Sequence, residues 1–206
     1  MYKVFFKESC FLLTDDQKLL KESKQNFVHK DFTITKAFVL SLLEKGEPFY
    51  IVLYHDDVEV LFSIFKSCFL YVKAGGGCVC TAEDLLIIKR LGVFDLPKGH
   101  QESHETIEQC AVREVEEECG LEQVSITAPL HSTFHIYQRN DCWYLKKTYW
   151  YMMSCPTEQT LRAQTEEDIE AVFWHPLGQL DSIVSQTYPS LEQVFEEVKA
   201  IVRRHA

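Results

Sequence analysis

The chain has 206 residues, of which 46% are hydrophobic and 25% are charged, and its formal net charge is -10 at pH 7. This composition is typical of a globular protein and excludes collagen, a coiled coil and intrinsic disorder. No apolar run approaches the roughly 18 residues that a membrane span requires, and Lys3, Lys7 and Glu8 interrupt the apolar core that a signal peptide would need. We therefore expect a cytoplasmic protein with no membrane partner.

The negative charge is concentrated in the second part of the chain. Residues 1–74 hold ten lysines and ten acidic residues, whereas residues 75–206 hold eleven basic residues against twenty-one acidic ones. This balance argues against a nucleic-acid partner. Between residues 102 and 122, eight glutamates accompany a single basic residue, Arg113. A segment with so many carboxylates requires a counter-charge.

Residues 1–72 predict a small α+β unit that precedes the rest of the chain. The predicted elements are strands at Tyr2–Phe6, Cys10–Leu13, Phe27–His29 and Phe49–Tyr54, and helices at Thr35–Leu43 and Asp57–Phe65. The sequence leaves the role of this unit open. It could cover an open sheet edge or form the interface of a homodimer.

A run of three glycines, Gly75–Gly77, follows this unit. Such a run is either a linker or a place where two backbones pack closely at the start of a strand. Because the charge balance changes here, we predict two domains, 1–72 and 73–206. The second is expected to continue with strands at Cys78–Thr81 and Leu85–Lys89.

The predicted elements after residue 100 begin with a helix over Thr106–Cys119, with Ser103 as its N-cap and Gly120 just after its end. Further strands are predicted at Thr127–Tyr137, Lys147–Ser154 and Ala171–Trp174, with a turn at residues 139–141 and a last helix over Ser190–Arg204.

Three carboxylates of the predicted helix, Glu114, Glu117 and Glu118, fall within an arc of about 100° at the helical spacing of about 100° per residue. The apolar residues of the same helix lie on a different side. An acidic face of this kind is most often simply solvated, because repulsion at i,i+3 and i,i+4 amounts to only a few tenths of a kcal/mol per pair. The helix by itself therefore does not indicate a site.

The residues around the helix change this interpretation. From Gly99 the chain reads Gly, five residues, Glu105, seven residues, then Arg113-Glu114-Val115-Glu116-Glu117-Glu118-Cys119-Gly120-Leu121. This resembles the signature box of the Nudix hydrolases at every fixed position, a match that chance would give on the order of once in ten million chains of this length. The resemblance covers Lys73–Ala206 and implies an α/β/α sandwich with a mixed sheet, in which the box forms a loop, a helix and a loop.

The resemblance also implies a chemistry, the cleavage by water of a nucleoside diphosphate linked to another moiety. Glu114, Glu117 and Glu118 would bind Mg²⁺ or Mn²⁺, for which carboxylate oxygens are suitable ligands, and the Gly99 carbonyl is a further candidate ligand. Arg113 and Glu105 would orient the catalytic glutamates Glu117 and Glu118. The general base would come from the box helix or from a later loop, where Glu166 and Glu167 are candidates beside the simpler interpretation of a solvated turn.

The box does not identify the substrate. The run Leu96-Pro97-Lys98-Gly99-His100 resembles one found in dinucleoside polyphosphate hydrolases, and Lys98 would meet phosphate oxygens there. Tyr137 and Trp143, which flank the polar turn, are candidates for stacking on the base of the nucleotide. ADP-ribose and nucleotide sugars are alternative substrates. A non-catalytic sensor of nucleotide metabolites is an alternative function, which the complete box argues against.

Overall fold

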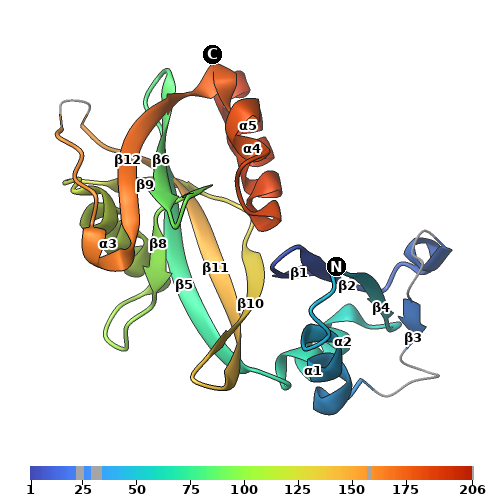
Figure 1. Ribbon diagram of the computed structural model, residues 1–206. Helices are drawn as coiled ribbons and strands as arrows, with labels where there is room; N and C mark the ends of the chain where they lie inside the picture. The colour runs from blue at the N-terminus through green and yellow to red at the C-terminus, as the bar shows by residue number, and fades with distance from the viewer. Residues whose placement is uncertain (22–25, 29–33, 157–158, 206) are drawn as a thin grey trace. The chain divides into compact units, whose positions relative to one another are not determined.

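The computed structural model describes residues 1–21, 26–28, 34–156 and 159–205 (Figure 1). The chain forms two compact units: unit 1 comprises Met1–Val72 and Phe134–Lys147, and unit 2 comprises Lys73–Thr133 and Thr148–Ala206. The division between Val72 and Lys73 coincides with the predicted limit of the two domains, which stay a prediction. Residues 134–147, predicted to belong to the second domain, are part of unit 1 because Val4 pairs in parallel register with Phe134.

Unit 1 is a mixed sheet with two helices, as the sequence predicts for its first 72 residues. The strand order is β3-β4-β2-β1-β10-β11. Its elements are β1 (Tyr2–Phe6), β2 (Ser9–Thr14), the 3-10 helix η1 (Gln17–Lys21), β3 (Asn26–Val28), α1 (Lys36–Leu43), β4 (Tyr50–Tyr54), α2 (Val58–Lys66) and the hairpin that contains β10 (Thr133–Arg139) and the start of β11 (Cys142–Ser154). His29, predicted as the end of β3, lies outside the described residues.

Side-chain caps fix the two helices of unit 1. The Thr35 hydroxyl accepts the backbone N–H of Phe38 at the start of α1, and the Asp57 carboxylate accepts two backbone N–H groups at the start of α2. The apolar sides of both helices pack on the sheet, where Phe11, Leu53 and Phe65 are completely buried. Unit 1 therefore has a hydrophobic core of its own.

Unit 2 has the α/β/α arrangement that the family resemblance implies. In Figure 1, α3 (Ile107–Cys119) lies on one side of β5 (Leu70–Val79) and β11, and α4 (Asp181–Val184) and α5 (Glu192–His205) lie on the other. Alternate residues of β11 face the two sides, since Trp150 packs with α5 and Met153 packs with α3. Both faces of the sheet are therefore covered by helices.

The remaining elements of unit 2 surround this centre. They are β6 (Asp84–Arg90), β7 (Val93–Asp95), β8 (Lys98–His100), β9 (Ser125–Pro129), η2 (Thr165–Glu167), β12 (Ile169–Pro176), η3 (Leu177–Gln179) and η4 (Pro189–Leu191). β8 and β9 pair with β5 and β11, while β12, β6 and β7 form a second sheet. The strand predicted over Thr127–Tyr137 is in fact two strands, because the backbone leaves the sheet between Pro129 and Thr133. No helix among the described residues is long and apolar enough to cross a membrane.

The three glycines lie inside β5 and do not form a linker. A Cβ on Gly75 would lie 2.6 Å from the backbone nitrogen of Ala111 in α3, and a Cβ on Gly77 would lie 2.8 Å from the Val115 side chain. The expected close packing of two backbones is therefore correct, although the glycines lie within the strand and not at its start. Small residues in this strand allow α3 to approach the sheet closely enough to bury part of its acidic face.

Gly75→Ala should destabilise unit 2, because the new methyl group meets the α3 backbone and cannot be relieved by a side-chain rotation. We expect the free energy of unfolding to fall by about 1–3 kcal/mol, the usual range for overpacking, as measured by urea titration. Gly178→Ala is the matched control, since no described atom lies within 4 Å of the place that a Cβ would take there. Equal stability of the two variants would contradict the close approach of α3.

Candidate active site

Helix α3 begins at a capping box. The Thr106 hydroxyl accepts the backbone N–H of Gln109, and the Gln109 side chain accepts the backbone N–H of Thr106 at 2.8 Å. The prediction of Ser103 as N-cap is therefore wrong, since this reciprocal pair starts the helix three residues later. Gly120 ends the helix with φ = 68°, in the left-handed region, as predicted.

The three box carboxylates of α3 differ in their surroundings. Glu114 and Glu118 are buried, with 7% and 0% of their surface exposed, whereas about half of the Glu117 side chain is exposed. Ala111 and Val115 are completely buried on the apolar side of the helix. A carboxylate taken out of water is costly unless it is hydrogen-bonded, paired or bound to a cation. The surroundings of Glu114 and Glu118 therefore determine what this site can bind.

Gly99, on β8, is the residue that makes room for Glu114. A Cβ at Gly99 would overlap the atoms of the Glu114 carboxylate, so no larger residue fits there. The Gly99 carbonyl oxygen lies 3.5 Å from Cys110 Sγ of α3. The glycine of the box thus brings a backbone carbonyl and a buried carboxylate into one place.

Only one of the two carboxylate oxygens of Glu118 has a hydrogen-bond partner among the described residues. Its Oε2 accepts the backbone N–H of Lys98 at 2.9 Å, while its Oε1 is buried without a hydrogen-bond partner among the described residues. Burial raises the pKa of Glu118 to about 7. A buried, unpaired carboxylate oxygen is rare in folded proteins and indicates a missing cation or proton at that atom.

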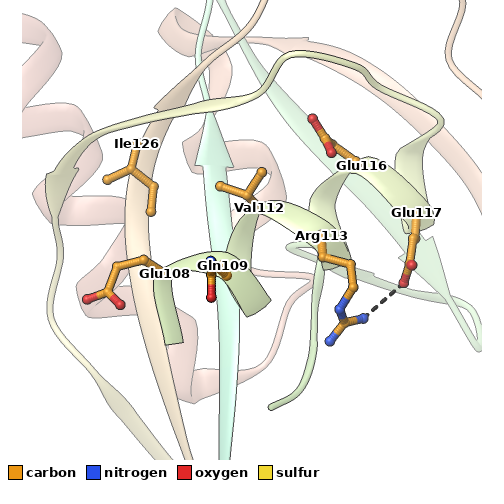
Figure 2. A pocket seen from close by; sticks show the side chains of 7 residues that line it. All are labelled: Glu108, Gln109, Val112, Arg113, Glu116, Glu117 and Ile126. Carbon is orange, nitrogen blue, oxygen red and sulfur yellow. Dashed lines mark hydrogen bonds and ion pairs between the residues drawn. The ribbon is translucent and has the colours of Figure 1, made fainter. Parts of the chain in front are cut away.

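Arg113 gathers three of the box carboxylates. Its guanidinium donates to Glu105 at 2.7 and 2.9 Å, to Glu114 at 2.8 Å and to Glu117 at 2.9 Å. Figure 2 shows the contact with Glu117. The two bonds from Arg113 lower the pKa of Glu105 to about 2, so Glu105 stays ionised and fixes the guanidinium. These contacts are compatible with the orienting role expected for Arg113 and Glu105, which stays a prediction.

The donors present fit a hard divalent cation. Glu114, Glu117, Glu118 and the Gly99 carbonyl offer oxygen atoms only, which suits Mg²⁺ or Mn²⁺. Within the described residues no three His, Cys, Asp or Glu side chains converge as a finished metal cluster, and Arg113 pairs with two of the candidate ligands. The fit rests on the bare Oε1 of Glu118 and on the Glu114 carboxylate in the space that Gly99 leaves.

Lys98 has a partner that the sequence did not reveal. Its ammonium pairs with the Asp95 carboxylate at 2.5 Å, and only 13% of the Lys98 side chain and 3% of the Asp95 side chain are exposed. Nothing in the spacing of the box points to Asp95, which lies upstream of it. The only local signal is an acidic residue three positions before a lysine, at the end of an apolar stretch.

Of the two candidate bases, Glu167 is the one whose charge reaches the box. Both residues lie in η2, and this loop is tied to the end of α3, since Gln164 N–H donates to the Glu118 carbonyl at 3.2 Å. The pKa of Glu114 is raised by burial and, to a smaller extent, by the charge of Glu167. Glu167 also lies 3.7 Å from Arg90. Catalysis by Glu166 or Glu167 stays a prediction.

The two aromatic candidates for base stacking belong to unit 1, whereas the box belongs to unit 2. Trp143 packs edge-on against Phe6 at a centroid distance of 5.5 Å, next to the core of unit 1. Tyr137 stacks on Tyr144 at 5.1 Å with an interplanar angle of 8°. These contacts give both rings a structural role, and their contact with substrate stays a prediction.

A pocket of about 490 Å³ lies along the outer side of α3 (Figure 2). It is lined by Glu108, Gln109, Val112, Arg113, Glu116, Glu117 and Ile126. Arg113 and Glu117 therefore belong both to this pocket and to the carboxylate cluster. Of the other five lining residues, Glu108 and Glu116 are acidic, Gln109 is polar and uncharged, and Val112 and Ile126 are apolar.

A comparison with protein families decides what this arrangement is. The family model described as NUDIX domain matches residues 72–197, which is more than half of the chain. The chain belongs to the Nudix hydrolase family. The resemblance seen in the sequence is confirmed, and the box residues of α3 lie within the matched segment.

Several solved structures are similar to this Nudix chain. A bifunctional NMN adenylyltransferase/ADP ribose pyrophosphatase from Francisella tularensis, in complex with AMP and a Mn ion, is 19% identical over 70% of this chain and 46% of that one, with a TM-score of 0.48. An Ap4A hydrolase from C. elegans is 19% identical over 65% and 94%, with a TM-score of 0.46. RenU, a Nudix hydrolase from M. smegmatis, is 17% identical over 66% and 89%, with a TM-score of 0.49. This similarity does not distinguish one Nudix substrate from another.

Burial of Glu118 should lower the stability of the metal-free protein at neutral pH. With a pKa of about 7 in the folded state and an ordinary value of 4.5 when unfolded, the carboxyl group opposes folding as pH rises from 4.5 to 7, by about 3 kcal/mol at most. In EDTA at pH 8 we therefore expect Glu118→Gln to unfold at a higher temperature than the wild type, with the difference vanishing near pH 4.5. Circular dichroism melts from pH 4.5 to 8.5 measure this, and a difference independent of pH would contradict it.

Proposed function

We propose that the chain is a metal-dependent pyrophosphohydrolase that cleaves a nucleoside diphosphate linked to another moiety. The bare, buried Oε1 of Glu118 is the observation that carries this proposal. A protein that only senses nucleotide metabolites has no need to keep an unpaired carboxylate oxygen in its core. The neighbouring Glu114, placed against Gly99, supports the same conclusion.

Mg²⁺ or Mn²⁺ held by Glu114, Glu117 and Glu118, with the Gly99 carbonyl as a further donor, would neutralise the diphosphate oxygens and make water a better nucleophile. The protein residues have separate tasks. The Lys98 backbone N–H orients Glu118, and Arg113, fixed by Glu105, orients Glu114 and Glu117. These contacts limit the motion of the carboxylates without neutralising Oε1 of Glu118.

We assign the removal of the proton from water to Glu167 ahead of Glu166. The support is the electrostatic influence of Glu167 on Glu114 together with the hydrogen bond that ties its loop to α3. A general base has to lie within hydrogen-bond reach of the water it activates, directly or through one further water. An exposed carboxylate on a loop beside the box can meet this requirement once substrate is bound.

We propose dinucleoside polyphosphates as the substrate class, on the basis of the Leu96–His100 run. Lys98 lies at the start of β8, and its backbone N–H donates to Glu118. Its charge is therefore close enough to the box to attract the phosphate groups of a bound substrate. ADP-ribose and nucleotide sugars contain the same diphosphate and are the alternatives. Tyr137 and Trp143 are proposed to contact the base of the nucleotide.

Purified protein with Mg²⁺ or Mn²⁺ should cleave at least one member of a panel of dinucleoside polyphosphates, ADP-ribose, nucleotide sugars and nucleoside triphosphates. Glu118→Gln should lower the turnover by two or more orders of magnitude, the scale of losing a catalytic group or a metal ligand. Product formation is followed by ion-exchange chromatography. A thermal shift with metal and nucleotide but no cleavage by the wild type would favour the sensor instead.

Lys98→Ala tests the substrate class. Loss of one charged hydrogen bond to phosphate, worth about 1.5 kcal/mol, should lower kcat/KM for a dinucleoside polyphosphate about tenfold more than for ADP-ribose. Any loss of stability from removing the buried ammonium affects both substrates alike, so the ratio isolates the contact. Both substrates are assayed at one ionic strength, because salt screens the phosphate charges of the free substrates over about 8 Å at physiological concentration. Equal losses would contradict the proposed substrate class.

A further inference from the structure

A buried ion pair lies directly beside Glu118. Asp95 ends β7 and is 3% exposed, and its carboxylate accepts the backbone N–H of Leu96 through Oδ1 at 2.8 Å and the Lys98 ammonium through Oδ2. The ammonium also lies 3.4 Å from the Leu96 carbonyl oxygen. The Asp95 carboxylate is thus fixed by the adjacent backbone and holds the ammonium in turn.

The Lys98 ammonium has a second negatively charged group in its neighbourhood. The backbone of Lys98 holds Oε2 of Glu118, while Oε1 of Glu118 is unpaired within the described part of the chain. After burial, the charge of Lys98 has the largest influence on the pKa of Glu118, and it lowers this pKa. Opposite charges attract strongly where water is excluded. Without a competing partner, the ammonium would pair with Oε1 and occupy the place of a metal ion.

The sheet fixes the course of the Lys98 side chain as well. Gly76 of β5 pairs with Lys98 of β8, and a Cβ on Gly76 would lie 2.7 Å from the Lys98 Cβ. The lysine therefore starts across a glycine and ends at Asp95. Contacts within unit 2 therefore fix the side chain at its Cβ, next to Gly76, and at its ammonium, next to Asp95.

We propose that Asp95 is a positioning residue that keeps the Lys98 ammonium away from Oε1 of Glu118 and so leaves this oxygen open for the divalent ion. The inference rests on the metal site of the proposed function. It assigns Asp95 no contact with substrate. Groups behind the direct ligands of a metal typically change its affinity by 10- to 100-fold when they are altered.

The experiment measures Mn²⁺ binding by electron paramagnetic resonance at pH 8 on full-length protein stripped of metal. In Asp95→Asn the ammonium loses its charged partner and pairs with Glu118, so the affinity for Mn²⁺ should fall at least tenfold. In the double variant Asp95→Asn with Lys98→Met the competing ammonium is gone, so the affinity should return to within about threefold of the wild type. If Asp95 only supported the fold, the second substitution, Lys98→Met, would not restore the affinity for Mn²⁺.

Two further variants complete the experiment. Lys98→Met alone keeps the backbone N–H that holds Glu118 and should bind Mn²⁺ about as well as the wild type, which tests the inference even if Asp95→Asn folds poorly. Asp181→Asn removes an Asp–Lys pair, with Lys199, at α4 and α5, in which the Asp181 side chain is 92% exposed, and serves as the control without effect on Mn²⁺.

Undiminished Mn²⁺ affinity in Asp95→Asn, or a double variant as weak as Asp95→Asn, would overturn the inference. So would a large loss of affinity in Lys98→Met. A wild type that binds Mn²⁺ but cleaves no member of the substrate panel would disprove the proposed hydrolase and leave the role of Asp95 intact. A wild type that binds no Mn²⁺ would remove the metal site and this inference together.

Discussion

Removing the carboxylates of Glu114 and Glu118 from water sets the conditions that the surrounding structure has to meet. Each loses hydration on burial, and their mutual repulsion grows as the effective dielectric constant falls. Three features of the chain meet these conditions. The Arg113 guanidinium and the backbone N–H of Lys98 donate hydrogen bonds to the two carboxylates, and Gly99 has no side chain and so leaves room for Glu114. None of these neutralises Oε1 of Glu118. The protein thus balances most of the negative charge and leaves one oxygen for a ligand that is not part of the chain.

The same constraint extends into the sheet. Burying an acidic helix face requires the helix to lie very close to its support, which side chains larger than hydrogen at residues 75 and 77 would prevent. The glycines of β5 and the glycine of the box therefore serve one geometric purpose from two strands that pair with each other, Gly75 opposite Gly99. Glycines lose more backbone conformational entropy on folding than other residues, and here they allow close packing in return. The burial that results raises the pKa of Glu118.

The sequence predicts this site well wherever function follows from spacing. The box residues have fixed spacings along α3 and the loop before it, so the family resemblance could point to Arg113, Glu105 and the three glutamates, whose roles stay predictions, and it also implied the α/β/α fold. Asp95 could not be found, because its importance comes from a contact with Lys98 and not from a spacing. Ser103 is a reasonable N-cap by residue type, but Thr106 has a reciprocal partner in Gln109. Strand pairing between residues 4 and 134 leaves no local signal at all, so the sequence could not show that residues 134–147 pack with unit 1.

That long-range pairing has a consequence for how the chain folds. β1 is synthesised about 130 residues before its parallel partner β10, and Phe134, Ile136 and Leu145 complete the core of unit 1 only when β10 and β11 have been made. Closing so large a loop is entropically unfavourable and slow compared with local contacts. During translation, residues 1–72 therefore have an unpaired edge at β1 and an incomplete core until β10 and β11 have been synthesised. A shortened chain beginning at residue 73 would carry the opposite problem, a hairpin whose apolar face has lost its partner.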